Sequence, residues 1–190
     1  MIDRFGLVLL TMFGIGHIKY APGTVASLIC CIFFYPNIVI ITISMNFSYF
    51  ILFFILLLVS SIILINKLSH HFKKKDPKEI VIDEFLGQSI PILFFLYIMN
   101  IDFTSDLFFF EEMIKDKALK FRETIIYGGF NHNKLIWILL SFISFRIFDI
   151  AKPFPINIID KKIKSGLGVV LDDIVAGIYA AAIVTFLFLF

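Results

Sequence analysis

Long apolar runs, separated by shorter polar segments, dominate the chain. A helix that spans a membrane needs about 20 apolar residues, and the five longest runs approach or reach that length. In chain order they are Val25–Ser44, Phe47–Ile65, Phe85–Met99, Leu135–Ile150 and Ile174–Phe190. They lack the alternating pattern of barrel strands, and only helices and closed barrels cross a bilayer. The pattern therefore predicts an all-α, polytopic membrane helical bundle with about five transmembrane helices.

The polar segments predict how this bundle is oriented. Lysines concentrate in residues 66–83 and 151–173, and lysine-rich loops stay on the cytoplasmic side of a membrane. Five spans joined in order place both loops, and residues 1–24, on that side. The turn at 45–46, a mixed-charge insert at about 101–133 and the C-terminus then fall on the other side. All Gly-, Pro- and Asp-rich motifs are thus expected at the cytoplasmic face of one domain, which covers the whole chain.

Composition supports a lipid environment. Hydrophobic residues make up 59% of the chain and include 25 Phe, whereas soluble domains are about 45–50% apolar. The net charge is only +2, and no basic tract alternates with aromatic residues, so we expect no nucleic-acid partner. Cys30 and Cys31 are adjacent within an apolar run, which indicates core packing rather than a disulfide or a metal site.

Two pairs of adjacent acids precede apolar runs. These pairs are Asp83-Glu84 and Asp172-Asp173, and a glycine follows one acid of each pair by four residues. Charges close to a bilayer are costly and usually functional. Acids at a helix start can also simply stabilise the helix dipole. The repetition of the same device at two helices favours a functional interpretation.

A third motif combines cations with a carboxylate. Arg146, Asp149 and Lys152 recur every three residues, a spacing that predicts one shared helical face. Pro153 and Pro155 are then expected to stop the helix. Two cations that flank a carboxylate suit a metal-bound phosphate. The alternative is a row of interfacial ion pairs that reach out to water.

The N-terminal motif contains the turn residues Pro22-Gly23, followed by Thr24 as the expected N-cap of the first span. Free backbone N–H groups at a helix start bind anions, so this turn is a candidate cradle for a phosphate or a lipid headgroup. An ordinary turn before a helix explains the same residues.

Taken together, the motifs predict an oxygen-ligand metal site. The acids expected at or near helix ends are Asp83, Glu84, Asp149, Asp172 and Asp173, with Asp160 as a possible sixth. Such a cluster repels itself unless a cation neutralises it, and all-oxygen ligation favours Mg²⁺. The chain has no GxSxG, P-loop, Cys-x5-Arg or DxDxT motif, so metal-activated water is the simplest phosphate chemistry left.

These motifs resemble those of the phosphatidylglycerophosphatase A family of bacterial membrane phosphatases. The matching motifs are APGTxxS at 21–27, DExxG at 83–87, FRxFDxxKPxPI at 145–156, Asp160, and GLGxxxDDxVAG at 166–177. The resemblance implies Mg²⁺-dependent hydrolysis of phosphatidylglycerophosphate to phosphatidylglycerol and phosphate, in phospholipid biosynthesis at the inner membrane. Two departures are Ala26, where the family pattern has Gly, and the long 101–133 insert.

The site residues then take expected roles. Five acids, Asp83, Glu84, Asp149, Asp172 and Asp173, would hold Mg²⁺ and orient water, and Asp160 would complete the shell or act as base. Arg146 and Lys152 would grip the phosphate, with Pro22, Gly23 and Thr24 against the headgroup. Two rivals remain open: a cation channel or ion-coupled transporter, since intramembrane acids often mark ion paths, and a lipid-headgroup phosphotransferase, although its common DGxxAR motif is absent.

Overall fold

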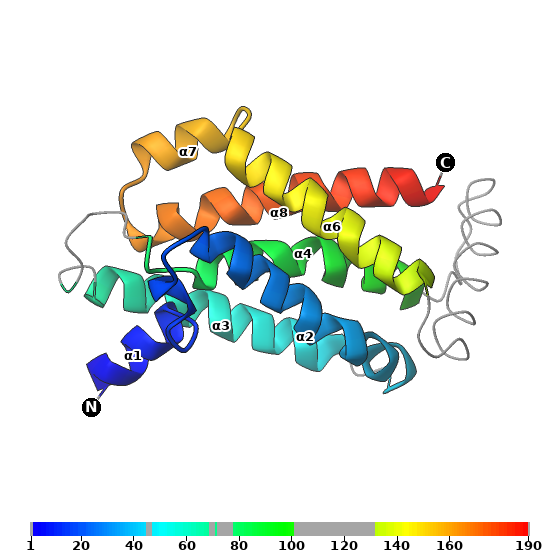
Figure 1. Ribbon diagram of the computed structural model, residues 1–190, viewed down its shortest axis with the longest axis horizontal. Helices are drawn as coiled ribbons and strands as arrows, with labels where there is room; N and C mark the ends of the chain where they lie inside the picture. The colour runs from blue at the N-terminus through cyan, green and yellow to red at the C-terminus, as the bar shows by residue number, and fades with distance from the viewer. Residues whose placement is uncertain (1, 45–46, 69–70, 72–77, 101–131, 190) are drawn as a thin grey trace.

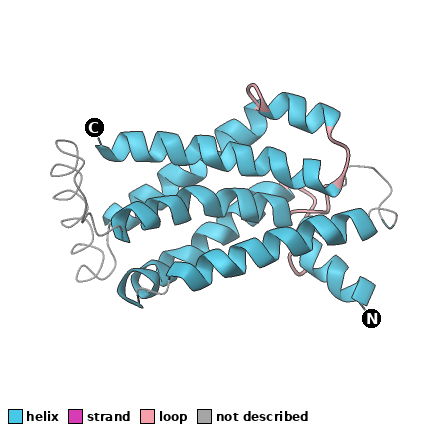
Figure 2. Ribbon diagram, turned by 180° about the vertical axis from the view of Figure 1, so that it is seen from behind, coloured by secondary structure: helices cyan, strands magenta, loops and turns pink. Residues whose placement is uncertain are grey.

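The computed structural model describes residues 2–44, 47–68, 71, 78–100 and 132–189. These residues form helices, turns and loops, and Figure 2 draws no strand among them. The prediction of an all-α fold is therefore confirmed for the described part of the chain. In chain order the elements are α1 Ile2–Leu10, the 3-10 turn η1 Ile15–His17, α2 Pro22–Ser44, α3 Phe47–Leu68, α4 Ile82–Asn100, α6 His132–Ala151, α7 Ile156–Lys162 and α8 Gly166–Leu189.

Five of these helices (α2, α3, α4, α6 and α8) run along the length of the molecule (Figure 1). The starts of α4 and α8, the end of α6, the short helix α7 and the turn η1 gather at one end of the bundle. The end of α4 and the start of α6 lie at the opposite end. The motif residues, although far apart in sequence, are thus collected at one end.

Helices α4 and α8 pack closely because small residues line their contact. A Cβ atom added to Gly177 would lie 2.4 Å from the carbonyl oxygen of Gly87, and one added to Gly87 would lie 2.6 Å from that of Asp173. Ala176 and Ala180 on the same helix are fully buried. Close approach through small residues is typical of helix packing in membranes, and Gly87, four residues after Asp83, here allows α8 to come close to α4.

The outer surface of the bundle is rich in large apolar side chains. On α3, for example, Leu52, Leu56 and Ile63 are each more than half exposed, which suits contact with hydrocarbon better than contact with water. Within the described residues, two helical segments are long and apolar enough to cross a membrane, Tyr49–Leu68 and Gly166–Phe188. The count of five spans stays a prediction.

Several predicted boundaries and residues can be compared with the structure. The described residues of all five apolar runs lie in helices, but α8 begins at Gly166, eight residues before the predicted start at Ile174. The Gly166 N–H group donates to Oδ1 of Asn66 at 2.7 Å, a long-range contact that anchors this earlier start. Cys30 and Cys31 are buried without a disulfide, as predicted. The 45–46 turn and residues 101–131 of the insert lie outside the described residues.

The predicted N-cap of α2 is wrong. The helix begins at Pro22, so Thr24 lies inside its first turn. Ala21 precedes the helix with a positive φ of 47°, and its carbonyl accepts a hydrogen bond from the Val25 N–H group at 3.1 Å. Proline favours the first helical position because its fixed φ suits the helix and its missing N–H would have no partner there.

Candidate active site

A cavity of about 240 Å³ opens at the end of the bundle where α4 and α8 begin. Its volume would hold roughly eight water molecules. The lining residues come from α4, α6, α7, α8 and the segments beside them: Lys78, Ile80, Asp83, Glu84, Asp149, Lys152, Asp160, Ile163, Lys164, Gly168, Val169, Asp172 and Asp173. All six acids named from the sequence therefore line one cavity.

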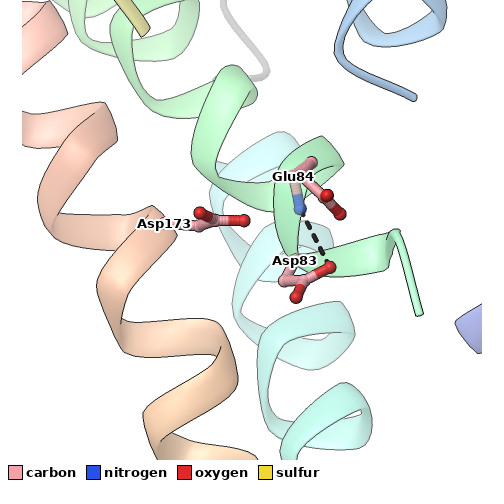
Figure 3. A group of neighbouring side chains, drawn as sticks. All are labelled: Asp83, Glu84 and Asp173. Carbon is pink, nitrogen blue, oxygen red and sulfur yellow. Dashed lines mark hydrogen bonds between the residues drawn. The ribbon is translucent and has the colours of Figure 1, made fainter. Parts of the chain in front are cut away.

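Three of these acids form a tight group (Figure 3). Asp83 and Glu84 from α4 and Asp173 from α8 each offer a carboxylate oxygen, and these oxygens lie within 4.8 Å of one another. Asp83 and Asp173 are 8% and 4% exposed. The Glu84 N–H group donates to Oδ1 of Asp83 at 3.1 Å, a contact that holds the two neighbouring acids of α4 together.

This group has the chemistry of a magnesium site. Buried carboxylates at this spacing repel one another unless a cation lies between them. Oε2 of Glu84 is buried and has no hydrogen-bond partner among the described residues, although a buried oxygen is costly to leave unsatisfied. Hard divalent cations take such oxygens as ligands. The donor set therefore fits Mg²⁺, with Asp149 and Asp172 in the same cavity but outside the group of three.

The position of the acids on their helices separates two interpretations. Asp83 and Glu84 lie in the first turn of α4, where they also stabilise the helix dipole. Asp173 lies seven residues into α8, with Asp172 beside it, which is roughly two turns from the helix start. The dipole effect falls off within the first turn. Helix capping therefore does not explain the position of the α8 pair.

Lys152 forms ion pairs with one acid on α7 and one acid on α8. Its Nζ lies 2.7 Å from Oδ2 of Asp172 and 3.0 Å from Oδ1 of Asp160. Burial lowers the pKa of Lys152, but its hydrogen bonds to Asp172 and Asp160 raise it by more, so the pKa lies above its ordinary value. Lys152 therefore stays protonated at neutral pH and carries its charge into the cavity.

The predicted shared helical face is wrong for Lys152. Helix α6 ends at Ala151, and Lys152 takes a positive φ of 42°. Pro153 favours the end of the helix at Ala151, because proline disfavours the helical conformation in the residue before it. The side chain consequently turns toward α7 and α8. Asp160 was expected in a loop, but it lies on α7.

Arg146 does not line the cavity but contacts a residue that does. Its Nη1 is 2.5 Å from Oδ2 of Asp149, with the two side chains only 16% and 13% exposed. Asp149 lines the cavity and Arg146 does not. Arg146 thus contacts the cavity through its ion pair with Asp149. Its predicted role in binding phosphate stays a prediction.

The Pro22-Gly23-Thr24 turn also lies outside the cavity lining. It supports the site from behind, because a Cβ atom on Gly23 would lie 2.1 Å from Oε1 of Glu84. The backbone of α2 is thus packed directly against a carboxylate of the three-acid group. Only glycine leaves room for Glu84 in this position.

Two lysines of the cavity were missed from the sequence. Lys78 and Lys164 line it, yet as members of lysine-rich loops they had served only to predict orientation. The available signal was their position, five residues before Asp83 and four after Asp160. With Lys152 and Arg146 they bring four positive charges against six carboxylates. Two negative charges remain, which one divalent cation would balance.

Comparison with known proteins places this site in a family. The sequence pattern of the family described as Phosphatidylglycerophosphatase A matches residues 8–188. The chain belongs to this family. No solved structure matches the chain.

Three relatives show how the similarity is distributed. Phosphatidylglycerophosphatase A of Haemophilus influenzae is 52% identical over 48 residues, and that of Escherichia coli is 43% identical over 51 residues. These segments cover 25% and 27% of this chain, and 29% and 30% of the relatives. A Bacteroides thetaiotaomicron protein, provisionally named a phosphatidylinositol-3-phosphatase, is 25% identical over 170 residues, which cover 90% of this chain and 85% of that protein.

Proposed function

We propose that this protein is a Mg²⁺-dependent membrane phosphatase that hydrolyses phosphatidylglycerophosphate to phosphatidylglycerol and inorganic phosphate, as a step of phospholipid biosynthesis. The observation that carries the proposal is the group of carboxylates of Asp83, Glu84 and Asp173 in a cavity that also holds Lys152. Family membership supports the same reaction, since the relatives from two bacteria bear the name of that activity.

The proposed reaction transfers the phosphoryl group to water. Asp83, Glu84 and Asp173 would hold Mg²⁺, with Asp149 and Asp172 nearby to complete the shell through water. When bound, Mg²⁺ would polarise the phosphate oxygens and stabilise the charge of the transition state. Lys152 would bind a phosphate oxygen through its protonated Nζ, which Asp160 and Asp172 orient.

The proton balance follows from the residues that line the cavity. Water attacks phosphorus, the bond between phosphorus and the glycerol oxygen breaks, and a carboxylate of the cavity accepts the proton of the water. The same carboxylate would return this proton to the leaving glycerol oxygen, which becomes the hydroxyl group of phosphatidylglycerol. Arg146 would hold the carboxylate of Asp149 in place, because their ion pair is largely buried.

We further propose that the five long helices span the bacterial inner membrane, with the cavity at the cytoplasmic face. Support comes from the gathering of the motif residues at one end of the bundle (Figure 1). Lys161, Lys162 and Lys164 lie at that same end, as the positive-inside rule requires for a cytoplasmic face. A lipid headgroup would then reach the cavity from the adjoining leaflet.

The test is the release of inorganic phosphate by the purified protein in a nonionic detergent. Phosphatidylglycerophosphate, phosphatidylinositol 3-phosphate and glycerol 3-phosphate are offered in turn with Mg²⁺. We expect the highest kcat/KM for phosphatidylglycerophosphate. A preference for phosphatidylinositol 3-phosphate would move the proposal to the substrate named for the Bacteroides relative. Transfer of the phosphate to another alcohol without phosphate release, or ion flux without hydrolysis, would refute it.

A further inference from the structure

The cavity has an acidic floor and a basic mouth. Asp83 and Asp173 at the floor are 8% and 4% exposed. Lys78, from the segment before α4, and Lys164, from the segment between α7 and α8, also line the cavity, but both are exposed. The positive charges of these two lysines therefore lie on the path by which a ligand enters from outside.

The two mouth lysines differ from the other cations of the site. Lys152 and Arg146 are already paired with carboxylates. Within the described parts of the chain, no carboxylate forms an ion pair with Lys78 or Lys164. Nζ of Lys164 donates to the main-chain oxygen of Asp160 at 2.5 Å, a contact that holds the side chain over α7 without neutralising its charge. Both lysines therefore keep a charge that can bind an anion.

The proposed substrate carries two anionic groups. Its terminal phosphomonoester is the group that reacts, and a phosphodiester lies on the other side of the glycerol unit, toward the lipid. With the monoester beside the carboxylate-held metal at the floor, the phosphodiester extends toward the mouth. A lysine ammonium binds phosphate oxygens as a point charge and needs no fixed geometry, which suits a group close to mobile lipid.

We propose that Lys78 and Lys164 bind the phosphodiester of the substrate headgroup and so select lipids that carry a phosphodiester in addition to the terminal monoester. This inference rests on the proposed function. Phosphatidic acid has a terminal monoester but no phosphodiester. It can occupy the floor of the cavity, but it gains nothing from the mouth lysines.

The experiment compares kcat/KM for phosphatidylglycerophosphate and for phosphatidic acid in nonionic mixed micelles at one mole fraction of lipid. We expect Lys78→Ala and Lys164→Ala each to lower the ratio of the two values about three- to fivefold, and the double variant about tenfold or more. Lys78→Arg and Lys164→Arg should retain most of the ratio, because they keep the charge.

Matched controls are Lys161→Ala and Lys162→Ala, which remove exposed lysines of α7 that do not line the cavity. These should leave the ratio unchanged. An equal fall for both lipids in the mouth variants, or the same fall in the α7 controls, would overturn the inference and indicate a general attraction of anionic lipid. No phosphate release from phosphatidylglycerophosphate by the wild-type protein would overturn the proposed function, and this inference with it.

Discussion

Replacing Gly23 with alanine would test whether the α2 turn positions the acidic cluster. The added Cβ atom would lie 2.1 Å from Oε1 and 2.9 Å from Cδ of Glu84, whereas ordinary contacts begin near 3.4 Å. The carboxylate must therefore move by about 1.3 Å, the difference between the required and the available distance to Oε1. Misplacement of a catalytic group by about 1 Å can cost about a hundredfold in rate.

Helix propensity alone predicts that Gly23→Ala stabilises the protein and leaves the site unaffected. Gly23 lies in the first turn of α2, and alanine is favoured over glycine in helices by about 0.5–1 kcal/mol. The atom that Cβ meets is the end of a flexible side chain, so the fold should survive. We expect a folded protein with kcat lowered about a hundredfold and a higher Mg²⁺ requirement, because Glu84 is displaced from the group of three.

The assay measures phosphate release against free Mg²⁺, together with thermal unfolding in detergent. The matched control is Gly6→Ala, another helical glycine whose Cβ atom would meet a flexible side chain, Leu68 Cδ1 at 2.6 Å, on a helix that contributes no residue to the cavity. This control should keep kcat within about threefold. If Gly23→Ala were folded and kept both its kcat and its Mg²⁺ dependence, the contact with Glu84 would have no functional role.

Three further predictions concern the acids, Lys152 and the topology. Asparagine at each of four acid positions should lower kcat at least about a hundredfold, since a lost transition-state contact typically costs about 3 kcal/mol. Normal turnover in any two of these variants, with the protein folded, would show that the active site lies elsewhere. The variants are Asp83→Asn, Asp149→Asn, Asp172→Asn and Asp173→Asn. The pKa of Lys152 is raised, so its ion pairs stabilise the fold below about pH 10 and are lost only as the pH rises beyond that. The difference in Tm between the wild-type protein and Lys152→Met should accordingly be the same at pH 6 and pH 9, and a difference that shrinks by pH 9 would contradict this. A cysteine at Ser105 should react with an impermeant thiol reagent in intact cells and one at Ser165 should not; the reverse pattern would invert the orientation.

Much of the fold could be predicted from hydrophobic length alone. The described residues of each of the five apolar runs are helical in the structure. A helix satisfies the hydrogen bonds of its own backbone, which is why a long apolar run predicts one. The helix ends were harder to predict. The early start of α8 at Gly166 depends on a hydrogen bond to Asn66, one hundred residues away. A contact at that separation leaves no signal in the local pattern, so Asp172 and Asp173 were wrongly expected at the helix start.

The candidate site was predicted in its composition but only partly in its geometry. Motif residues pointed to six acids that do line one cavity. Periodicity misled at Lys152, where the helix ends one residue earlier and the side chain turns to Asp172. The supporting role of Gly23 depends on how α2 packs against α4, and the role of Lys78 depends on where the segment before α4 lies relative to the cavity. The local spacing of residues in the sequence does not predict such tertiary contacts.

The most direct test of the central claim is the Mg²⁺ dependence of hydrolysis in the wild-type protein and in Asp173→Asn. Initial rates of phosphate release from phosphatidylglycerophosphate are measured from excess EDTA up to saturating free Mg²⁺. We predict no release in EDTA, a saturable rise for the wild-type protein, and for Asp173→Asn a weaker Mg²⁺ response with a much lower maximal rate. Full release by the wild-type protein in excess EDTA would contradict the metal-dependent mechanism.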